Sequence, residues 1–225
     1  MERRGEGTDA AGVAQPDLFG ERYDAWYDGP VGRRAFPQEC AALQPLLDGL
    51  PRLWLEVGVG TGRFAAALGV PYGLDPAPAA LALARRRGVA VVQARGEALP
   101  LRARSLGAVL LIVTLCFVAD PLAVLRESRR VLRPDGGLVL GLVLAESPWG
   151  QWYRALARAG HPYYRLARFF TREELAGLLD AAGFAITRER SALLRPPPEV
   201  LPDEPAREGF DVRAGFSAIL ARPRR

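Results

Sequence analysis

Residues 53–64 read Leu-Trp-Leu-Glu-Val-Gly-Val-Gly-Thr-Gly-Arg-Phe, and this stretch decides the fold. A short apolar run leads into three glycines at alternate positions, and a helical pattern follows over residues 63–68. Glycines at such a junction let the backbone turn tightly and let a ligand lie against the main chain. In a doubly wound sheet the ligand then sits at the carboxyl end of the strand, beside the helix N-terminus. The stretch therefore predicts the ligand-binding turn of an α/β sheet.

The glycine spacing excludes two familiar nucleotide-binding loops. A dinucleotide fingerprint requires G-x-G-x-x-G. Counted from Gly58, its last glycine falls on Arg63; counted from Gly60, it falls on Ala65. A P-loop requires a Gly-Lys pair, and the sequence contains no lysine. Instead Glu56 precedes the glycines in the order acid-x-Gly-x-Gly-x-Gly, which suits a ligand that lacks a pyrophosphate and carries a cationic group.

A second acidic residue ends the next predicted strand, where residues 72–76 read Tyr-Gly-Leu-Asp-Pro. The carboxylate of Asp75 at this place can accept hydrogen bonds from both hydroxyls of a ribose. The two acids together favour a nucleoside with a zwitterionic or cationic tail. S-adenosylmethionine, which has an adenosine, a sulfonium, an ammonium and a carboxylate, fits this description.

Outward from this turn, predicted strands alternate with predicted helices. Strand patterns occupy residues 70–75, 89–93, 108–115, 138–144, 184–193 and 212–221. Helical patterns occupy residues 77–87, 121–132 and 171–182, and the last of these opens with a Thr-Arg-Glu-Glu capping box. This alternation implies a parallel sheet with helices on both faces.

The remaining segments are predicted to surround one domain, residues 20–225. Residues 20–50 have a helical pattern and are expected to form an N-terminal cap, and residues 1–19 are expected to form a flexible arm. Residues 147–170 hold a large share of the aromatic side chains and are expected to form a lid insertion.

Five motifs follow one another along the chain. They are the glycine motif at residues 55–62, Leu-Asp at 74–75, Gly-Glu-Ala-Leu-Pro-Leu at 96–101, Arg-Arg-Val-Leu-Arg-Pro-Asp-Gly-Gly-Leu at 129–138, and Thr-Arg-Glu-Glu-Leu at 171–175 with Ala-Gly-Phe at 182–184. In this order they resemble the class I S-adenosylmethionine-dependent methyltransferases, in particular the small-molecule group called type 11. The resemblance implies a Rossmann-like doubly wound sheet of seven mostly parallel strands, with an antiparallel last strand and a helical lid insertion.

The resemblance also implies roles for individual residues. Glu56 and the glycine loop would hold the methionine end of the cofactor, Asp75 its ribose, and the backbone at Gly96 its adenine edge. The full set of cofactor-binding positions is Glu56, Gly58, Gly60, Thr61, Gly62, Asp75, Pro76, Gly96, Glu97, Ala98 and Thr114. The family often has an aspartate in the adenine loop, where this chain has Arg95. The product of the cofactor would be S-adenosylhomocysteine.

Methyl transfer from a sulfonium is an in-line displacement, so positioning and desolvation can supply much of the catalysis. A base is needed only where the acceptor is protonated when it attacks. The sequence shows no catalytic dyad, and His161, its only histidine, is the candidate base. Residues 113–118 read Val-Thr-Leu-Cys-Phe-Val, without the Asn/Asp-Pro-Pro-Tyr/Phe motif of similar DNA-methylating enzymes. DNA is therefore not expected as the acceptor.

Side chains from three segments are expected to surround the acceptor. The predicted pocket residues are Tyr23, Tyr27, Cys116, Phe117, Trp149, Tyr153, Tyr163 and Tyr164. They would form a mostly apolar pocket with a few polar tips, which favours a small molecule. Such rings could also contact a cationic amine through cation–π interactions.

Composition excludes several other classes of protein. The chain has 225 residues with 49% hydrophobic and 24% charged positions, which suits one globular domain. Its net charge is +5, but part of the arginine excess lies at the two termini, so no nucleic-acid partner is expected. Two cysteines and one histidine cannot assemble a Cys/His metal cluster. No apolar run is long enough for a membrane span, and the polar N-terminus predicts a cytoplasmic protein.

Two other functions remain open from the sequence. A non-catalytic S-adenosylmethionine-binding protein needs the same pocket, and no essential base separates it from an enzyme. A nicotinamide-dependent oxidoreductase could use a similar sheet, although the glycine spacing argues against it. The sequence identifies neither the acceptor nor the oligomeric state.

Overall fold

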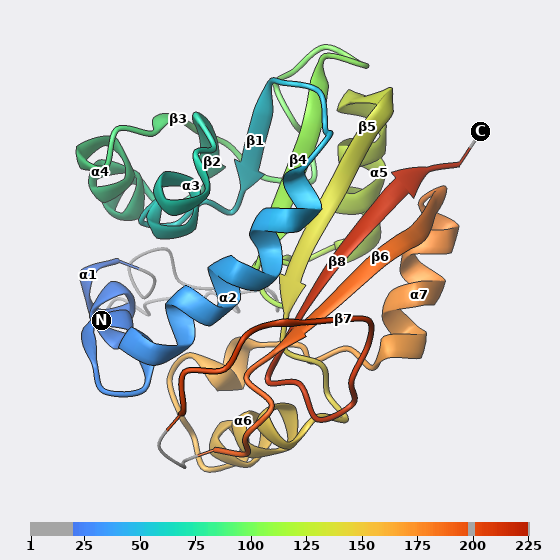
Figure 1. Cartoon of the computed structure of the whole chain (residues 1–225). Coiled ribbons are helices and arrows are strands. Elements are labelled where there is room, and N and C mark those ends of the chain that lie inside the picture. Colours follow the sequence, from blue (N-terminus) through green and yellow to red (C-terminus); the bar gives the residue numbers. More distant parts are fainter. Residues whose placement is uncertain (1–19, 198–200, 225) are drawn as a thin grey trace, which may run out of the picture.

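Eight strands form one sheet in the order β3-β2-β1-β4-β5-β8-β6-β7 in the computed structural model (Figure 1). The structure describes residues 20–197 and 201–224, and the predicted arm at residues 1–19 lies outside them. The strands are β1 (Trp54–Val57), β2 (Tyr72–Asp75), β3 (Ala90–Gln93), β4 (Leu106–Ile112), β5 (Leu132–Leu142), β6 (Phe184–Ala192), β7 (Arg207–Glu208) and β8 (Phe216–Pro223).

The strand directions confirm the predicted Rossmann-like sheet. Strands β1 to β5 pair in parallel, and β8 runs antiparallel between β5 and β6. The expected count of seven strands is corrected to eight in the described part of the chain, because Arg207 and Glu208 pair with the edge of β6. The carboxylate of Glu208 also binds the guanidinium groups of Arg188 and Arg190 on β6, which fixes this short strand.

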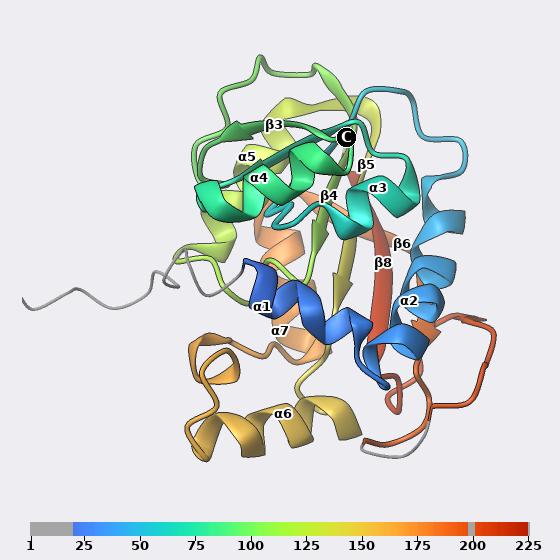
Figure 2. The ribbon, with the colours of Figure 1, turned by 90° about the vertical axis from the view of Figure 1, so that its left-hand side faces the viewer.

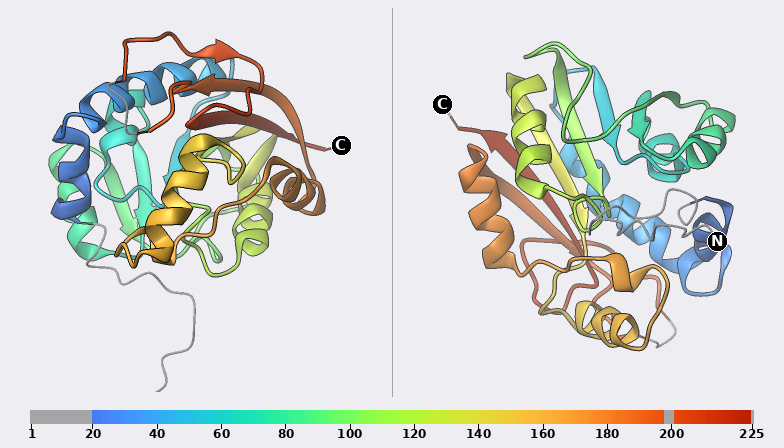
Figure 3. Two further views of the ribbon diagram at one scale, coloured as in Figure 1. Left: turned by 90° about the horizontal axis from the view of Figure 1, so that it is seen from below. Right: turned by 180° about the vertical axis from the view of Figure 1, so that it is seen from behind.

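Helices cover both faces of the sheet and its carboxyl edge. They are α1 (Glu21–Asp24), η2 (Ala25–Asp28), α2 (Gly32–Leu47), α3 (Arg63–Leu68), α4 (Pro78–Arg86), α5 (Pro121–Val131), α6 (Pro148–Arg158), η3 (Tyr164–Leu166) and α7 (Arg172–Ala181). Helices α5 and α7 lie on the face opposite to α2 (Figure 3). Helices α1 and α6 lie at the same end of the sheet (Figure 2). These two helices belong to the predicted cap and lid.

Two hydrophobic cores lie on the two faces of the sheet. All seven residues of β4 are buried, and successive side chains point to opposite faces. Leu110 belongs to the core beneath α2, α3 and α4, whereas Val109 and Leu111 belong to the core beneath α5 and α7. The continuous apolar run predicted at residues 108–115 is therefore explained by burial on both faces.

A capping signal in the sequence marks the observed start of α7. Thr171 and Glu174 form the capping box at the start of α7. The Arg-Pro-Asp-Gly-Gly run at residues 133–137, whose proline and glycines are typical of a turn, lies within β5, beside a register shift between Leu106 and Ala108 of β4. None of the helices in residues 20–197 and 201–224 is long and apolar enough to cross a membrane.

Candidate functional site

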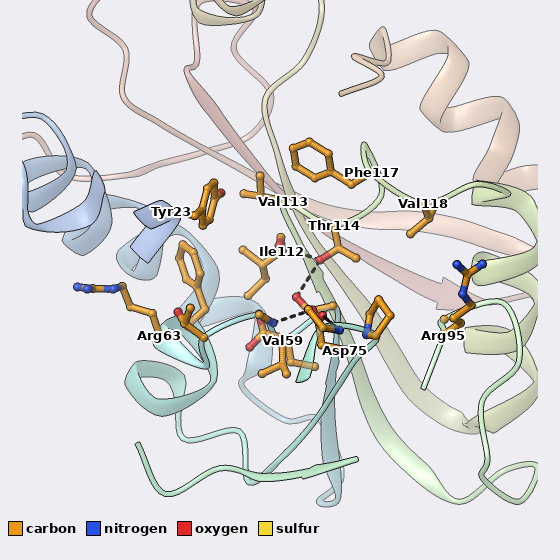
Figure 4. Close-up of a pocket in the computed structure, with 18 of the residues that line it drawn as sticks. Tyr23, Val59, Arg63, Asp75, Arg95, Ile112, Val113, Thr114, Phe117 and Val118 are labelled. Atoms are coloured by element: carbon orange, nitrogen blue, oxygen red, sulfur yellow. Dashed lines mark hydrogen bonds between the residues drawn. The ribbon is translucent and has the colours of Figure 1, made fainter. Parts of the chain in front are cut away.

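Two adjoining cavities open at the carboxyl end of the sheet. Figure 4 shows the first, which lies where β1, β2 and β4 end. Most of the predicted cofactor positions line it, together with three of the predicted pocket or cap residues. These lining residues are Glu56, Gly58, Gly60, Thr61, Asp75, Pro76, Gly96, Glu97, Thr114, Tyr23, Tyr27 and Phe117. Arg95 also lines this cavity, at the position where the family often has an aspartate.

Two predicted cofactor positions, Gly62 and Ala98, are not among the residues that line either cavity. Gly62 begins α3 with φ of 77°, and a Cβ atom there would lie 2.8 Å from the Cβ of Ala84 on α4. This glycine is needed for the close approach of two helices. Ala98 is exposed, and its amide donates to the carbonyl of Arg95, which closes a turn whose first three residues line the first cavity.

The glycine loop is tied to the ends of two neighbouring strands. Gly58 has φ of 73°, and a Cβ atom there would overlap the side chain of Thr114 after β4. The Thr114 hydroxyl donates to the carbonyl of Ile112 at 3.0 Å and contacts that of Gly58 at 3.3 Å. Gly60 also has a positive φ, and nothing lies within 4 Å of its missing Cβ. The backbone at Gly60 is therefore open to a ligand.

Asp75 joins the end of β2 to the glycine loop. Its Oδ2 accepts a hydrogen bond from the Gly60 amide at 3.0 Å, and its Oδ1 accepts one from the Ala77 amide at 2.8 Å (Figure 4). Burial raises the pKa of Asp75, and these two amides partly offset that rise. Each carboxylate oxygen can accept a further bond. The side chain can therefore orient the loop and still bind ligand hydroxyls.

Glu56 is a buried carboxylate with an unsatisfied oxygen. The residue is 2% exposed, and its Oε2 has no hydrogen-bond partner. Burial raises the pKa of Glu56 well above its ordinary value, a hydrogen bond from the Ala65 backbone lowers it, and the nearby Asp75 raises it further. A buried acid without a partner is costly. A cationic ligand group in the first cavity would satisfy it.

Asp24 at the end of α1 fastens the cap to the glycine loop. Its carboxylate accepts hydrogen bonds from Arg63 at 2.7 Å, from Arg87 at 2.7 Å and from the Thr61 hydroxyl at 2.5 Å. Burial alone would raise the pKa of Asp24, but these three donors hold it well below its usual range. Arg87 also donates to the carbonyl of Thr61 at 2.7 Å. We call Asp24, Thr61, Arg63 and Arg87 the latch.

Asp24→Asn is expected to destabilise the fold by about 2–3 kcal/mol, because two partly buried arginines lose their shared carboxylate. Urea unfolding at neutral pH measures this loss. Since the Asp24 pKa is lowered on folding, its contribution is present at neutral pH and disappears from the wild type as the pH falls below the ordinary range of an aspartate. Asp28→Asn is the control, because Asp28 contacts Arg63 but is 63% exposed. Equal losses in the two variants would contradict a specific latch.

The second cavity lies between the cap and the lid and has a volume of about 670 Å³. It is within the usual size range of small-molecule sites. Seven predicted pocket residues and the predicted base line it. They are Tyr23, Tyr27, Cys116, Phe117, Tyr153, Tyr163, Tyr164 and His161.

Trp149, a predicted pocket residue, is not among the residues that line either cavity. Its side chain is 2% exposed, and its indole N–H donates to the carbonyl of Arg195 at 2.7 Å. The ring packs so closely on Gly215 that a Cβ atom there would overlap it. Trp149 therefore anchors α6 to the C-terminal part of the sheet, whereas Trp152 and Tyr153, which follow it on α6, line the cavity.

Cys116 and His161 have different chemical capacities in the second cavity. Burial raises the pKa of Cys116 to about 12, so it stays a thiol at neutral pH and is a poor nucleophile. His161 stacks on Tyr164 with 4.4 Å between ring centroids. Its buried Nδ1 has no partner in the structure. The ring is therefore available to a ligand, as a candidate base requires.

The two cavities share a wall. Tyr23, Tyr27, Val113 and Phe117 line both of them. Tyr23 packs edge to face on Tyr27 and on Tyr163, with 6.2 Å and 5.6 Å between ring centroids. Ligands in the two cavities would therefore lie on either side of these side chains.

Glu39 of α2 is a feature of the second cavity that the sequence reasoning missed. The residue is 5% exposed, lines the cavity, and its Oε2 has no hydrogen-bond partner. Burial raises the pKa of Glu39 to about 8. Helical spacing places Glu39 on the same face as the buried Ala35, Ala42 and Leu43. An acid on the apolar face of a helix was the signal that could have found it.

Glu39→Gln is expected to remove a pH-dependent loss of stability. Because the pKa of Glu39 rises from 4.5 to about 8 on folding, the folded chain keeps this proton to higher pH than the unfolded chain. Stability therefore falls between these two pH values, by about 1.4 kcal/mol per pH unit, and the full loss is present above pH 8. Urea unfolding of both proteins at about pH 5 and about pH 9 measures the difference. An identical change in both proteins would show that Glu39 does not titrate this way.

This chain is similar to a known domain family and to other known proteins. The methyltransferase domain family matches residues 55–140. An uncharacterised protein of Mycobacterium tuberculosis is 50% identical over 200 residues, which cover 88% of this chain and 70% of that protein.

Solved structures resemble this one over nearly the whole chain. A Thermotoga maritima protein described as an S-adenosylmethionine-dependent methyltransferase, possibly a histamine N-methyltransferase, is 36% identical. It matches 89% of this chain and 94% of its own, with a TM-score of 0.81. The CcbJ methyltransferase of Streptomyces caelestis is 21% identical over 96% of this chain and 100% of its own, with a TM-score of 0.67, and this likeness concerns the fold alone.

Proposed function

Because the chain belongs to the class I S-adenosylmethionine-dependent methyltransferases of the type 11 group, we propose that it methylates a small molecule held in the second cavity. The shared wall of the two cavities is the observation that carries this proposal. The methyl donor would occupy the first cavity and the acceptor the second, so that transfer takes place between Tyr23, Val113 and Phe117.

The first cavity has the donors and acceptors that S-adenosylmethionine requires. The unpartnered Oε2 of Glu56 would accept a hydrogen bond from the ammonium of the cofactor. The carboxylate of Asp75 would bind the ribose hydroxyls while it still holds the Gly60 amide. The backbone of Gly96 and Glu97 would meet the adenine. The open space beside Gly60 leaves room for the methionine part.

Methyl transfer from the bound cofactor requires that the acceptor is correctly positioned and that water is excluded. S-adenosylmethionine supplies a methyl group whose bond to sulfur breaks as the acceptor's electron pair forms the new bond, leaving S-adenosylhomocysteine. Tyr23, Tyr27 and Phe117 would shield this transfer from water and fix the direction of attack. The latch would hold the two tyrosines in place, because α1 and η2 carry them.

The relatives support an acceptor of small size. The Thermotoga maritima protein, which is described as a possible histamine N-methyltransferase, would act on a small amine. The second cavity of this chain, with a volume of about 670 Å³ and many aromatic side chains in its lining, suits a molecule of that class better than a nucleic acid or a protein. The family match does not favour the nicotinamide oxidoreductase alternative.

Calorimetric titration tests the cofactor assignment, with expected dissociation constants on the order of micromolar for S-adenosylmethionine and S-adenosylhomocysteine. Glu56→Gln and Asp75→Asn are each expected to weaken binding about 10-fold or more, because each removes a charged acceptor. Asp180→Asn on α7 is the control, since its side chain is 61% exposed and far from both cavities. Binding of NADH in place of S-adenosylmethionine would contradict the proposal.

A further inference from the structure

Each of the two cavities contains one deeply buried carboxylate with an unsatisfied oxygen. Glu56 lines the first cavity only, and Glu39 lines the second cavity only. The cofactor's ammonium accounts for Glu56 in the proposed function. Nothing in the described part of the chain accounts for Glu39, because its Oε2 has no partner there. A buried acid that lacks a partner calls for a ligand that supplies one.

The cavity around Glu39 is aromatic, and five tyrosines line it. Burial raises the pKa values of Tyr27 and Tyr153, neighbouring tyrosines and Glu39 raise them further, and these phenols therefore stay neutral. Hydrogen bonds join Tyr23 to Tyr27 and Tyr153 to Tyr164. The phenols are thus engaged with one another in pairs. Rings of this kind stabilise a cation through their faces.

The other charged or titratable groups that line the cavity leave Glu39 without a positive partner. They are Cys116, which stays a thiol, His161, which stacks on Tyr164, and Arg168. Arg168 is exposed, and its guanidinium lies over the ring of Phe170 at 4.6 Å. A ligand cation is therefore the complement that this cavity lacks, because its charge would favour the ionised form of Glu39, whereas a ligand carboxylate would disfavour it.

We propose that Glu39 binds the amino group of the methyl acceptor, and that the acceptors of this protein are small organic amines with an apolar body. This inference rests on the proposed methyl transfer and names its substrate class. The apolar body would lie against Tyr153, Tyr164 and Trp152, and the amino group would meet the free Oε2 of Glu39.

The same carboxylate can prepare the nitrogen for attack. An ammonium has no free electron pair, so it must lose one proton first. The proton passes from nitrogen to Glu39, whose apolar surroundings favour the neutral acid. The freed pair then forms the bond to the methyl carbon, and the pair of the carbon–sulfur bond stays on sulfur. The product is an N-methylammonium, and Glu39 returns the proton to water after release.

The test compares three probes with one shared body, phenethylamine, 2-phenylethanol and 3-phenylpropanoate, on the full chain saturated with S-adenosylhomocysteine. Calorimetry is expected to show the amine bound about 10-fold or more tightly than the alcohol, and the carboxylate bound weakest. With radiolabelled S-adenosylmethionine, the label is expected in the amine. This comparison needs no variant, so it stands even where a variant folds poorly.

Variants then assign the preference to Glu39. Glu39→Gln is expected to weaken amine binding about 10-fold to 100-fold, and to leave alcohol binding and S-adenosylhomocysteine binding within about twofold of wild type. Glu39→Asp is expected to restore part of the amine preference. Cys40→Ala, on the same helix but outside both cavities, is the matched control and is expected to bind as wild type does.

The outcomes separate the two proposals. Failure of the wild type to bind S-adenosylhomocysteine would overturn the proposed function itself. Binding of S-adenosylhomocysteine with no preference for the amine over the alcohol would overturn only the amine inference. An amine preference that Glu39→Gln leaves unchanged would also overturn it, because the cation would then be recognised elsewhere.

Discussion

Parallel pairing of β1 with β2 and with β4 is the constraint on which the site depends. Val57 lies opposite Leu74, and Glu56 lies opposite Leu110, so the three strands end at the same edge. This brings Glu56, Asp75 and Thr114 together although they are far apart in the chain. The glycine loop then closes over them, because positive φ angles let its backbone approach Thr114 and Asp75 without a Cβ in the way.

The latch connects this edge to the cap and thereby builds the second cavity. Asp24 bridges to the glycine loop through Thr61, to the start of α3 through Arg63 and to the end of α4 through Arg87. The aromatic residues of α1 and η2 consequently form the wall between donor and acceptor. The latch thus positions the residues that would cover the cofactor and that also line the acceptor cavity.

The two buried glutamates lower the stability of the empty protein. Desolvation raises the pKa values of both Glu56 and Glu39, and each has an oxygen without a partner. Such a cost fits groups that are stabilised by ligands rather than by the fold. If each ligand places a positive charge beside its glutamate, binding would offset the cost of burying that acid. The folded protein would then be most stable with both ligands bound.

The sequence by itself determined the α/β order and the acids Glu56 and Asp75, because these follow from short-range periodicity and from motifs within one turn. The antiparallel end of the sheet was implied only by the resemblance to the methyltransferase family. The roles of Gly62, Ala98 and Trp149 depended on the tertiary structure, since each is set by a neighbour distant in the fold or by the direction of exposure. Asp24 and Arg87 are 63 residues apart, and the cavity around Glu39 is assembled from the cap, α2 and the lid. The helical pattern could mark Glu39 as a buried acid, but the partners of Asp24 and the cavity around Glu39 arise only when distant segments pack together, so no local pattern could reveal those.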